Sequence, residues 1–135
     1  MVGRPLILCV DERREALFVR KMLLEQFGCD VVTADDAHQG LIAATHQKID
    51  LVIIDYHLTV AGNGEHLARD LRACRPGLPL IMLTGDPTVP ESAKSSVDAT
   101  LIKGFIDPSD LLATIQKLLP GASVRQPRRV SQRTA

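Results

Sequence analysis

The sequence predicts an α/β protein with one doubly wound parallel sheet and helices on both of its faces. Short apolar runs recur along the chain, and a segment with helical features follows each of them. Most of these runs are apolar at consecutive rather than alternate positions, which is typical of strands buried between two layers of helices. Strands and helices that alternate in this way form parallel sheets through right-handed crossovers.

Five segments are expected to be strands because they are short, rich in branched apolar residues and followed by polar residues. They are Leu6–Val10, Asp30–Ala34, Leu51–Asp55, Leu80–Leu83 and Thr100–Ile102. The third strand delivers a carboxylate, Asp55, directly after four branched apolar residues. Because ligands of open α/β sheets bind at the carboxyl ends of the strands, Asp55 lies where chemistry is expected.

Two helices are expected in the first half of the chain. The first follows Asp11 and Glu12 and ends at Gly28, because glycine readily adopts the left-handed conformation that closes many helices. Its core-facing residues are expected to be Val19, Leu23 and Phe27, with Leu24 beside them. The second covers residues 37–47, where Asp35 and Asp36 can cap the first turn. Its apolar side is expected to contain Leu41, Ile42 and Ala44.

Three further helices are expected in the second half. One covers residues 65–75, with Leu67 and Leu71 one turn apart. Residues 88–97 are expected to form only a short or mobile helix, because proline and several serines disfavour a helix interior. The last runs from Pro108 to Leu119, since proline suits the first turn of a helix. Its inward residues are expected to be Leu111, Ile115 and Leu118.

The composition is that of an ordinary globular domain. The chain has 135 residues, of which 45% are hydrophobic and 24% charged. No apolar run is long enough to cross a bilayer, and the first residues lead into a strand without a secretory signal. The three cysteines are odd in number and lack a C-x-x-C spacing, which argues against disulfides or a zinc site. We therefore expect a cytoplasmic protein with reduced thiols.

Charge is unevenly distributed, although the formal net charge is zero. Residues 1–124 hold all 16 acids against 12 Lys and Arg, a net charge of −4, and the last residues carry four arginines and no acid. The composition predicts a domain over residues 1–121 and a disordered basic tail over residues 122–135. Four charges without interleaved aromatic residues are a weak basis for nucleic-acid binding, so we expect neither nucleic acid nor a membrane as a partner.

Residues of definite chemistry lie at the ends of four expected strands. Asp11 and Glu12 follow the first, Asp55 ends the third, Thr84 follows the fourth, and Lys103 follows the fifth. In a doubly wound sheet these ends share one edge, so the side chains are expected to converge. Three carboxylates in one place repel one another unless a cation neutralises them, and their hard oxygen atoms favour Mg²⁺.

Such a site suits the transfer of a phosphoryl group to a carboxylate. Aspartate is a chemically reasonable phosphoryl acceptor, and a phosphoryl group on Asp55 would bring about two negative charges. Mg²⁺ and Lys103 would match that charge from two sides. The Thr84 hydroxyl and the backbone N–H of Gly85 could donate hydrogen bonds to the phosphoryl oxygens.

Four short motifs occur in order at these strand ends. They are Val10-Asp11-Glu12, Ile54-Asp55-Tyr56-His57-Leu58 with Gly64 downstream, Leu83-Thr84-Gly85 and Ile102-Lys103-Gly104-Phe105. With these motifs the chain resembles the receiver domain of two-component response regulators over about residues 4–120. Four motifs in the right order and at the right separations are far more specific than any one of them.

The resemblance implies a flavodoxin-like sheet of five strands in the order 2-1-3-4-5, with five helices. It implies that Asp55 accepts a phosphoryl group from a sensor histidine kinase or a histidine phosphotransfer protein. The implied ligands of Mg²⁺ are Asp11, Glu12, Asp55 and the backbone carbonyl of His57.

By the same resemblance, Thr84 and Lys103 form the switch pair that senses the phosphoryl group. The signal would pass to a downstream protein through the face of the fourth helix, fifth strand and fifth helix. The protein would then be a signalling phosphoacceptor rather than an enzyme, although it would assist its own phosphoryl transfer and dephosphorylation.

Three features depart from the family pattern. Gly104 stands where the family usually has proline after the lysine, which predicts a looser loop into the last helix. Thr100 stands where the family has its switch aromatic, and a small hydroxyl side chain cannot swing between buried and exposed packing as a ring does. The loop after Asp55 lacks the common proline and is a residue longer, as in receiver domains attached to hybrid kinases.

Other functions fit the sequence less well. A degenerate receiver that acts as a phosphorylation-independent scaffold is an alternative because of Thr100 and Gly104. An aspartyl-phosphate phosphatase of another α/β family would need an aspartate where this chain has His57. A nucleotide-binding protein is disfavoured because the first turn is acidic and lacks G-x-G-x-x-G.

His57 itself is expected to be an exposed loop residue, the alternative being that it positions water for dephosphorylation. The histidines expected to be solvated helix residues are His38, His46 and His66.

Overall fold

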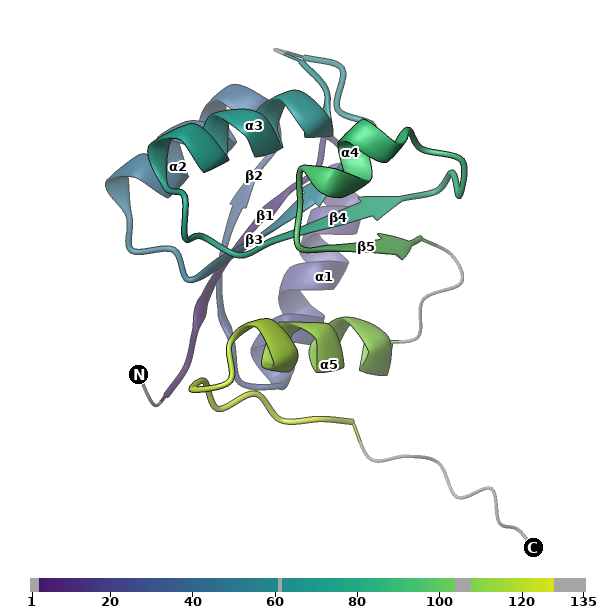
Figure 1. Ribbon diagram of the computed structural model, residues 1–135. Helices are drawn as coiled ribbons and strands as arrows, with labels where there is room; N and C mark the ends of the chain where they lie inside the picture. Colours follow the sequence, from purple (N-terminus) through teal and green to yellow (C-terminus); the bar gives the residue numbers. More distant parts are fainter. Residues whose placement is uncertain (1–2, 61, 104–107, 128–135) are drawn as a thin grey trace, which may run out of the picture.

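The sheet has five strands and is parallel throughout. The computed structural model describes residues 3–60, 62–103 and 108–127. Its strands are β1 (Leu6–Val10), β2 (Asp30–Ala34), β3 (Leu51–Asp55), β4 (Leu80–Thr84) and β5 (Ala99–Ile102). They lie in the order β2-β1-β3-β4-β5 (Figure 1). The predicted fold class and strand order are confirmed, and the strand bounds differ from the predicted ones by at most about one residue.

Helices cover both faces of the sheet, as predicted. They are α1 (Arg14–Gln26), α2 (Ala37–His46), α3 (Gly64–Cys74), α4 (Glu91–Ser95) and α5 (Pro108–Leu118). Buried residues of α2, α3 and α4 pack on one face, and those of α1 and α5 pack on the other (Figure 1). Helix α4 has only five residues, which agrees with the expectation of a short helix. Within the described ranges, no helix is long and apolar enough to span a membrane.

The register of the strands brings their carboxyl ends to one edge of the sheet. Asp55, the last residue of β3, lies opposite Leu83 of β4. Thr84, the last residue of β4, lies opposite Ile102 of β5. All five residues of β3 are buried, so Asp55 reaches this edge from inside the sheet.

Helix α1 buries part of its predicted face: Leu24 is buried and Phe27 packs against the core, but Val19 does not. Val19, expected to be buried, is 64% exposed, whereas Leu17 and Leu24 are buried. Arg20 lies between them on the inward face, and its side chain is only 12% exposed. The prediction for Val19 was wrong because Leu17 and Leu24, about two turns apart, decide which side of the helix faces the sheet.

Helix α2 packs against the sheet through small side chains. Its buried residues are Ala37, Gly40, Ala43 and Ala44. Ile42, expected on the apolar side, is 39% exposed. A Cβ at Gly40 would lie 2.9 Å from the Val10 side chain, so α2 lies close to β1 at this point. Such close packing leaves room only for small side chains on the buried face, and Ile42 therefore lies outside that face. The predicted cap is confirmed, because the Asp36 side chain accepts a hydrogen bond from the backbone N–H of Gln39.

Residues 122–127 lie against the folded domain, which differs from the expectation of a disordered tail beginning at residue 122. Val124 is 7% exposed and packs in the apolar cluster shared by α1 and α5. The N–H of Ser123 donates to the carbonyl oxygen of Gly3, and that of Arg125 donates to Phe27. Side-chain hydrogen bonds of Gln116, Arg125 and Gln126 also hold this segment, and its polar composition does not reveal these contacts. The remainder of the predicted tail, residues 128–135, lies outside the described residues.

Gly64 allows α3 to begin directly against the end of β3. Its N–H donates to the carbonyl oxygen of Tyr56 over 3.0 Å. A Cβ at Gly64 would lie 2.6 Å from the carbonyl oxygen of Asp55 and 2.7 Å from Cα of Tyr56. Both neighbours are backbone atoms that cannot turn aside, so this contact requires glycine. Reciprocal hydrogen bonds between Asn63 and His66 cap the same helix, a role that the sequence did not indicate for His66.

Gly64→Ala is expected to lower the free energy of unfolding by about 1–3 kcal/mol, because the added methyl group overpacks against the β3 backbone. Urea denaturation followed by circular dichroism measures this change. Gly77→Ala is the matched control, since a Cβ at Gly77 would meet no atom within 4 Å. Equal stability of the two variants would contradict the close contact at Gly64.

Candidate functional site

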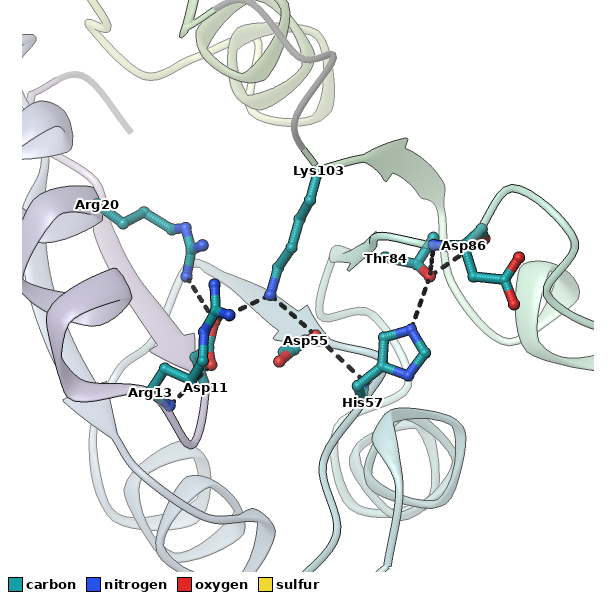
Figure 2. A network of polar contacts seen from close by, with 8 residues as sticks. All are labelled: Asp11, Arg13, Arg20, Asp55, His57, Thr84, Asp86 and Lys103. Atoms are coloured by element: carbon teal, nitrogen blue, oxygen red, sulfur yellow. Dashed lines mark hydrogen bonds and ion pairs between the residues drawn. The ribbon is translucent and has the colours of Figure 1, made fainter.

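A lysine joins two buried aspartates at the carboxyl edge of the sheet (Figure 2). Lys103, directly after β5, places its Nζ 3.2 Å from Oδ1 of Asp55 and 3.3 Å from Oδ2 of Asp11. Asp11 is 0% exposed and Asp55 is 5% exposed. The N–H of Lys103 donates to the carbonyl oxygen of Thr84, which anchors the start of the lysine side chain. The structure therefore brings together three of the side chains that were expected to converge.

The Asp11 carboxylate stays ionised although it is buried. Burial raises its pKa, but the N–H of Arg13 and the charge of Lys103 outweigh burial and hold the pKa below its ordinary value. The N–H of Arg13 donates to Oδ1 of Asp11 over 2.9 Å. Arg20 of α1 is a further partner, with its Nη1 3.5 Å from Oδ2 of Asp11. Asp11 is thus a buried anion with two cationic neighbours.

Glu12 binds the loop that follows β3. Its Oε2 accepts hydrogen bonds from the N–H groups of Thr59 and Val60, over 2.6 and 2.8 Å. The Thr59 hydroxyl donates to Oε1 over 2.9 Å. The two backbone N–H groups hold the pKa of Glu12 below its ordinary value. In the described part of the chain, no three acidic, histidine or cysteine side chains form a metal-binding group, so the expected gathering of three carboxylates is not found.

The Thr84 hydroxyl belongs to a local hydrogen-bond network (Figure 2). It accepts a hydrogen bond from the N–H of Asp86 over 3.0 Å and lies 3.4 Å from Nε2 of His57. His57 is exposed, as expected, and its N–H donates to Oδ1 of Asp55 over 3.1 Å. His57 therefore connects Thr84 with Asp55. A Cβ at Gly85 would meet no atom within 4 Å, so the surroundings of Gly85 do not require glycine.

A hollow of about 550 Å³ opens at this edge of the sheet. Its lining residues are Glu12, Arg13, Asp55, His57, Gly85 and Lys103. Carboxylate and carbonyl oxygens are the ligands that Mg²⁺ prefers, and Mg²⁺ usually keeps several waters, so it needs only a few protein oxygens. The donor set of Glu12 and Asp55 around one hollow therefore fits a hydrated Mg²⁺, although these oxygens do not form a closed cluster.

Of the two departures from the family pattern near β5, the structure describes Thr100 but not Gly104. Thr100 is partly buried within β5, where it lies opposite Met82 of β4. Gly104, for which a looser loop was predicted, lies outside the described residues, as does Phe105.

The sequence did not indicate three contacts of the site. Arg20 pairs with Asp11. Glu12 accepts hydrogen bonds from the backbone of Thr59 and Val60, and the His57 ring lies beside the Thr84 hydroxyl. The position of Arg20 follows from spacing, because it lies one turn after Leu17 and one turn before Leu24 on the same face of α1. The other two contacts depend on the path of the backbone after β3, which no residue pattern encodes.

Known proteins share the family and the fold of this chain. The family model of the response regulator receiver domain matches residues 7–116. The chain belongs to this family. The receiver domain fold is shared with a CheY-like response regulator receiver domain protein from Methanospirillum hungatei JF-1, which is 29% identical with a TM-score of 0.79 over 88% of this chain and 97% of that chain. The chemotaxis protein CheY4 of Vibrio cholerae is 27% identical with a TM-score of 0.77 over 86% of this chain and 99% of that chain.

The curated relatives are longer than this receiver domain. The transcriptional regulatory protein CusR of Escherichia coli (strain K12) is 32% identical over 123 residues, which are 88% of this chain but 53% of CusR. The transcriptional regulatory protein GlrR of the same strain is 30% identical over 90 residues, which are 67% of this chain and 20% of GlrR. The chain thus spans about half or less of the length of these relatives.

The contact between Glu12 and its loop is expected to weaken in acid. The pKa of Glu12 in the folded protein lies below its ordinary value of 4.5, so the stabilisation is complete above pH 4.5 and is lost as the pH falls through the lowered pKa. In EDTA, the NMR shifts of the Thr59 and Val60 amide protons should follow that titration. Glu12→Gln should abolish the change, and Asp86→Asn, which alters a different turn, should leave it. Amide shifts that do not titrate in the native protein would rule out the contact.

Proposed function

We propose that this receiver domain works in the cytoplasm and accepts a phosphoryl group on Asp55 from a phosphohistidine of a sensor histidine kinase or a histidine phosphotransfer protein. A carboxylate oxygen attacks phosphorus, the P–N bond to the histidine breaks, and the departing imidazole takes a proton. The observation that carries the proposal is the ion pairing of Lys103 with both Asp55 and Asp11. It puts a cation beside the acceptor, where the transferred group gathers negative charge.

The two oxygens of Asp55 have different surroundings. Oδ1 lies 3.2 Å from Nζ of Lys103 and accepts a hydrogen bond from the N–H of His57. Among the residues that the structure describes, none donates a hydrogen bond to Oδ2. We therefore assign Oδ2 as the attacking oxygen, while Oδ1 keeps its contact with the lysine.

Mg²⁺ is the cofactor that fits this reaction. The proposed ligands are Asp11, Glu12, Asp55 and the backbone carbonyl of His57. When bound, Mg²⁺ neutralises charge on the phosphoryl group and orients its oxygens. In support, Glu12 and Asp55 line one hollow. A protein of the same fold, the response regulator TrrA of Thermotoga maritima, has been solved in complex with Mg²⁺-BeF and is 23% identical with a TM-score of 0.79.

Thr84, Gly85 and Lys103 would bind the phosphoryl group after transfer. The Thr84 hydroxyl donates to the carbonyl oxygen of Asp86 over 3.2 Å in this structure, so it must exchange that partner to reach a phosphoryl oxygen. Such an exchange would move the start of the segment that leads to α4. A downstream protein would then read the changed face of α4, β5 and α5. The receiver domain is a signalling domain and not a classical enzyme. As a phosphoacceptor, it would assist its own phosphoryl transfer and dephosphorylation.

A phosphorylation-independent scaffold is the competing function. Thr100 favours it, because a small side chain in β5 cannot act as a swinging aromatic switch. The ion-paired Asp11, Asp55 and Lys103 favour the phosphoacceptor, because a scaffold needs no cation between buried carboxylates. Phosphoryl labelling distinguishes the two functions.

Asp55→Asn is expected to abolish labelling by acetyl phosphate, or by a cognate kinase, in the presence of Mg²⁺, because an amide does not form the acyl phosphate. Intact-protein mass spectrometry measures the added phosphoryl group. Asp35→Asn is the matched control, since Asp35 pairs with Arg14 at the surface. Retention of label by Asp55→Asn would sink the assignment of the acceptor, and an unlabelled native protein would favour the scaffold.

Lys103→Ala is expected to accept the phosphoryl group but to lose the conformational response, because the cation that links Asp55 to β5 is gone. Amide NMR spectra with and without beryllofluoride as a phosphoryl mimic measure the response. Lys48→Ala, at an exposed position after α2, should respond like the native protein. Equal responses in Lys103→Ala and Lys48→Ala would refute the switch role of Lys103.

A further inference from the structure

Arg20 brings a buried positive charge from α1 to the acidic site (Figure 2). Its side chain is 12% exposed, and its Nη1 lies 3.5 Å from Oδ2 of Asp11, the oxygen that Lys103 also contacts. Nη1 is buried and has no hydrogen-bond partner among the described residues. A buried N–H without a partner is costly, and apolar residues often stabilise a core as well as a buried ion pair does. Core stability alone therefore does not account for an arginine on the inward face of α1.

The charges at the sheet edge suggest what Arg20 does. Asp11 and Asp55 bring two negative charges to the edge, and Lys103 alone would leave one of them unmatched. With Arg20, the four side chains are neutral together without a metal ion. Arg13 lines the same hollow, but it is exposed, so water and salt screen its charge. Within the part of the chain that the structure describes, Arg20 and Lys103 are thus the two largely buried cations that contact Asp11.

We propose that Arg20 is a built-in counter-ion of Asp11, which stabilises the metal-free site and opposes the entry of Mg²⁺. This inference rests on the proposed Mg²⁺ site. Phosphorylated Asp55 carries about two negative charges where the free carboxylate carries one, and this added negative charge partly offsets the repulsion between Arg20 and Mg²⁺. Arg20 thereby makes the retention of Mg²⁺ depend on phosphorylation. It acts through Asp11 and is a positioning residue, since it does not touch the reacting atoms.

The neutral variants Arg20→Met and Arg20→Gln separate this role from a structural one. In EDTA their melting temperatures should fall by several degrees, because two buried carboxylates then share one lysine. In saturating MgCl₂ the deficit should shrink or vanish, because the metal replaces the missing charge. Isothermal titration calorimetry with MgCl₂ should show binding roughly three- to tenfold tighter than in the native protein, as expected for removing one unit charge several ångströms from the metal.

Two further variants serve as controls. Arg20→Lys keeps the charge and should bind Mg²⁺ about as the native protein does. Arg14→Met removes an arginine from the same helix, where its side chain is 85% exposed and pairs with Asp35. Neither the melting temperature nor the Mg²⁺ affinity of Arg14→Met should change appreciably.

The outcomes separate this proposal from the proposed function. An equal loss of melting temperature in EDTA and in MgCl₂, with unchanged Mg²⁺ affinity, would make Arg20 purely structural and leave the Mg²⁺ site standing. Neutral variants that fail to fold even in MgCl₂ would also overturn the counter-ion role, because the metal should replace the charge. A native protein that does not bind Mg²⁺ at all would overturn both this inference and the proposed Mg²⁺ chemistry.

Discussion

The ion pairs of Lys103 with Asp11 and Asp55 hold the carboxyl edge of the sheet together. Two neighbouring carboxylates buried at strand ends repel one another, and each is costly to remove from water without a cation. The lysine that meets this need lies 92 residues after Asp11 in the chain, so the last strand completes a site begun by the first. In the proposed function, the same cation would face the charge of an incoming phosphoryl group.

Short backbone contacts arrange the other groups around this lysine. Gly64 lets α3 start against the end of β3, and the N–H groups of Thr59 and Val60 hold the Glu12 carboxylate. The backbone N–H of His57 donates to one oxygen of the Asp55 carboxylate. The edge is therefore an acidic hollow whose carboxylates are held by hydrogen bonds and by an ion pair with Lys103.

The receiver fold is common to many proteins, whereas particular residues give this domain its own electrostatic character. Arg20 adds a largely buried cation on the side of α1, so Asp11, Asp55, Lys103 and Arg20 are neutral together without a metal ion. Thr100 leaves a small side chain in β5 where a ring would couple the site to the partner face. Under the proposed function, the state of Asp55 would therefore be conveyed by the charges near Asp11 rather than by the packing of a ring.

The residue pattern by itself determined the α/β class, the strand order through the family motifs, and the meeting of Asp11, Asp55 and Lys103, because parallel strands end at one edge of a sheet. It did not determine the whole buried face of α1, where Leu17 and Leu24 face the sheet and Val19 is exposed. Nor did it reveal the docking of residues 122–127 or the loop that holds a glutamate 47 residues before it. Only the tertiary structure decided these contacts, because they join segments that are distant in the chain, and many of them use backbone groups, which are the same whatever the side chain.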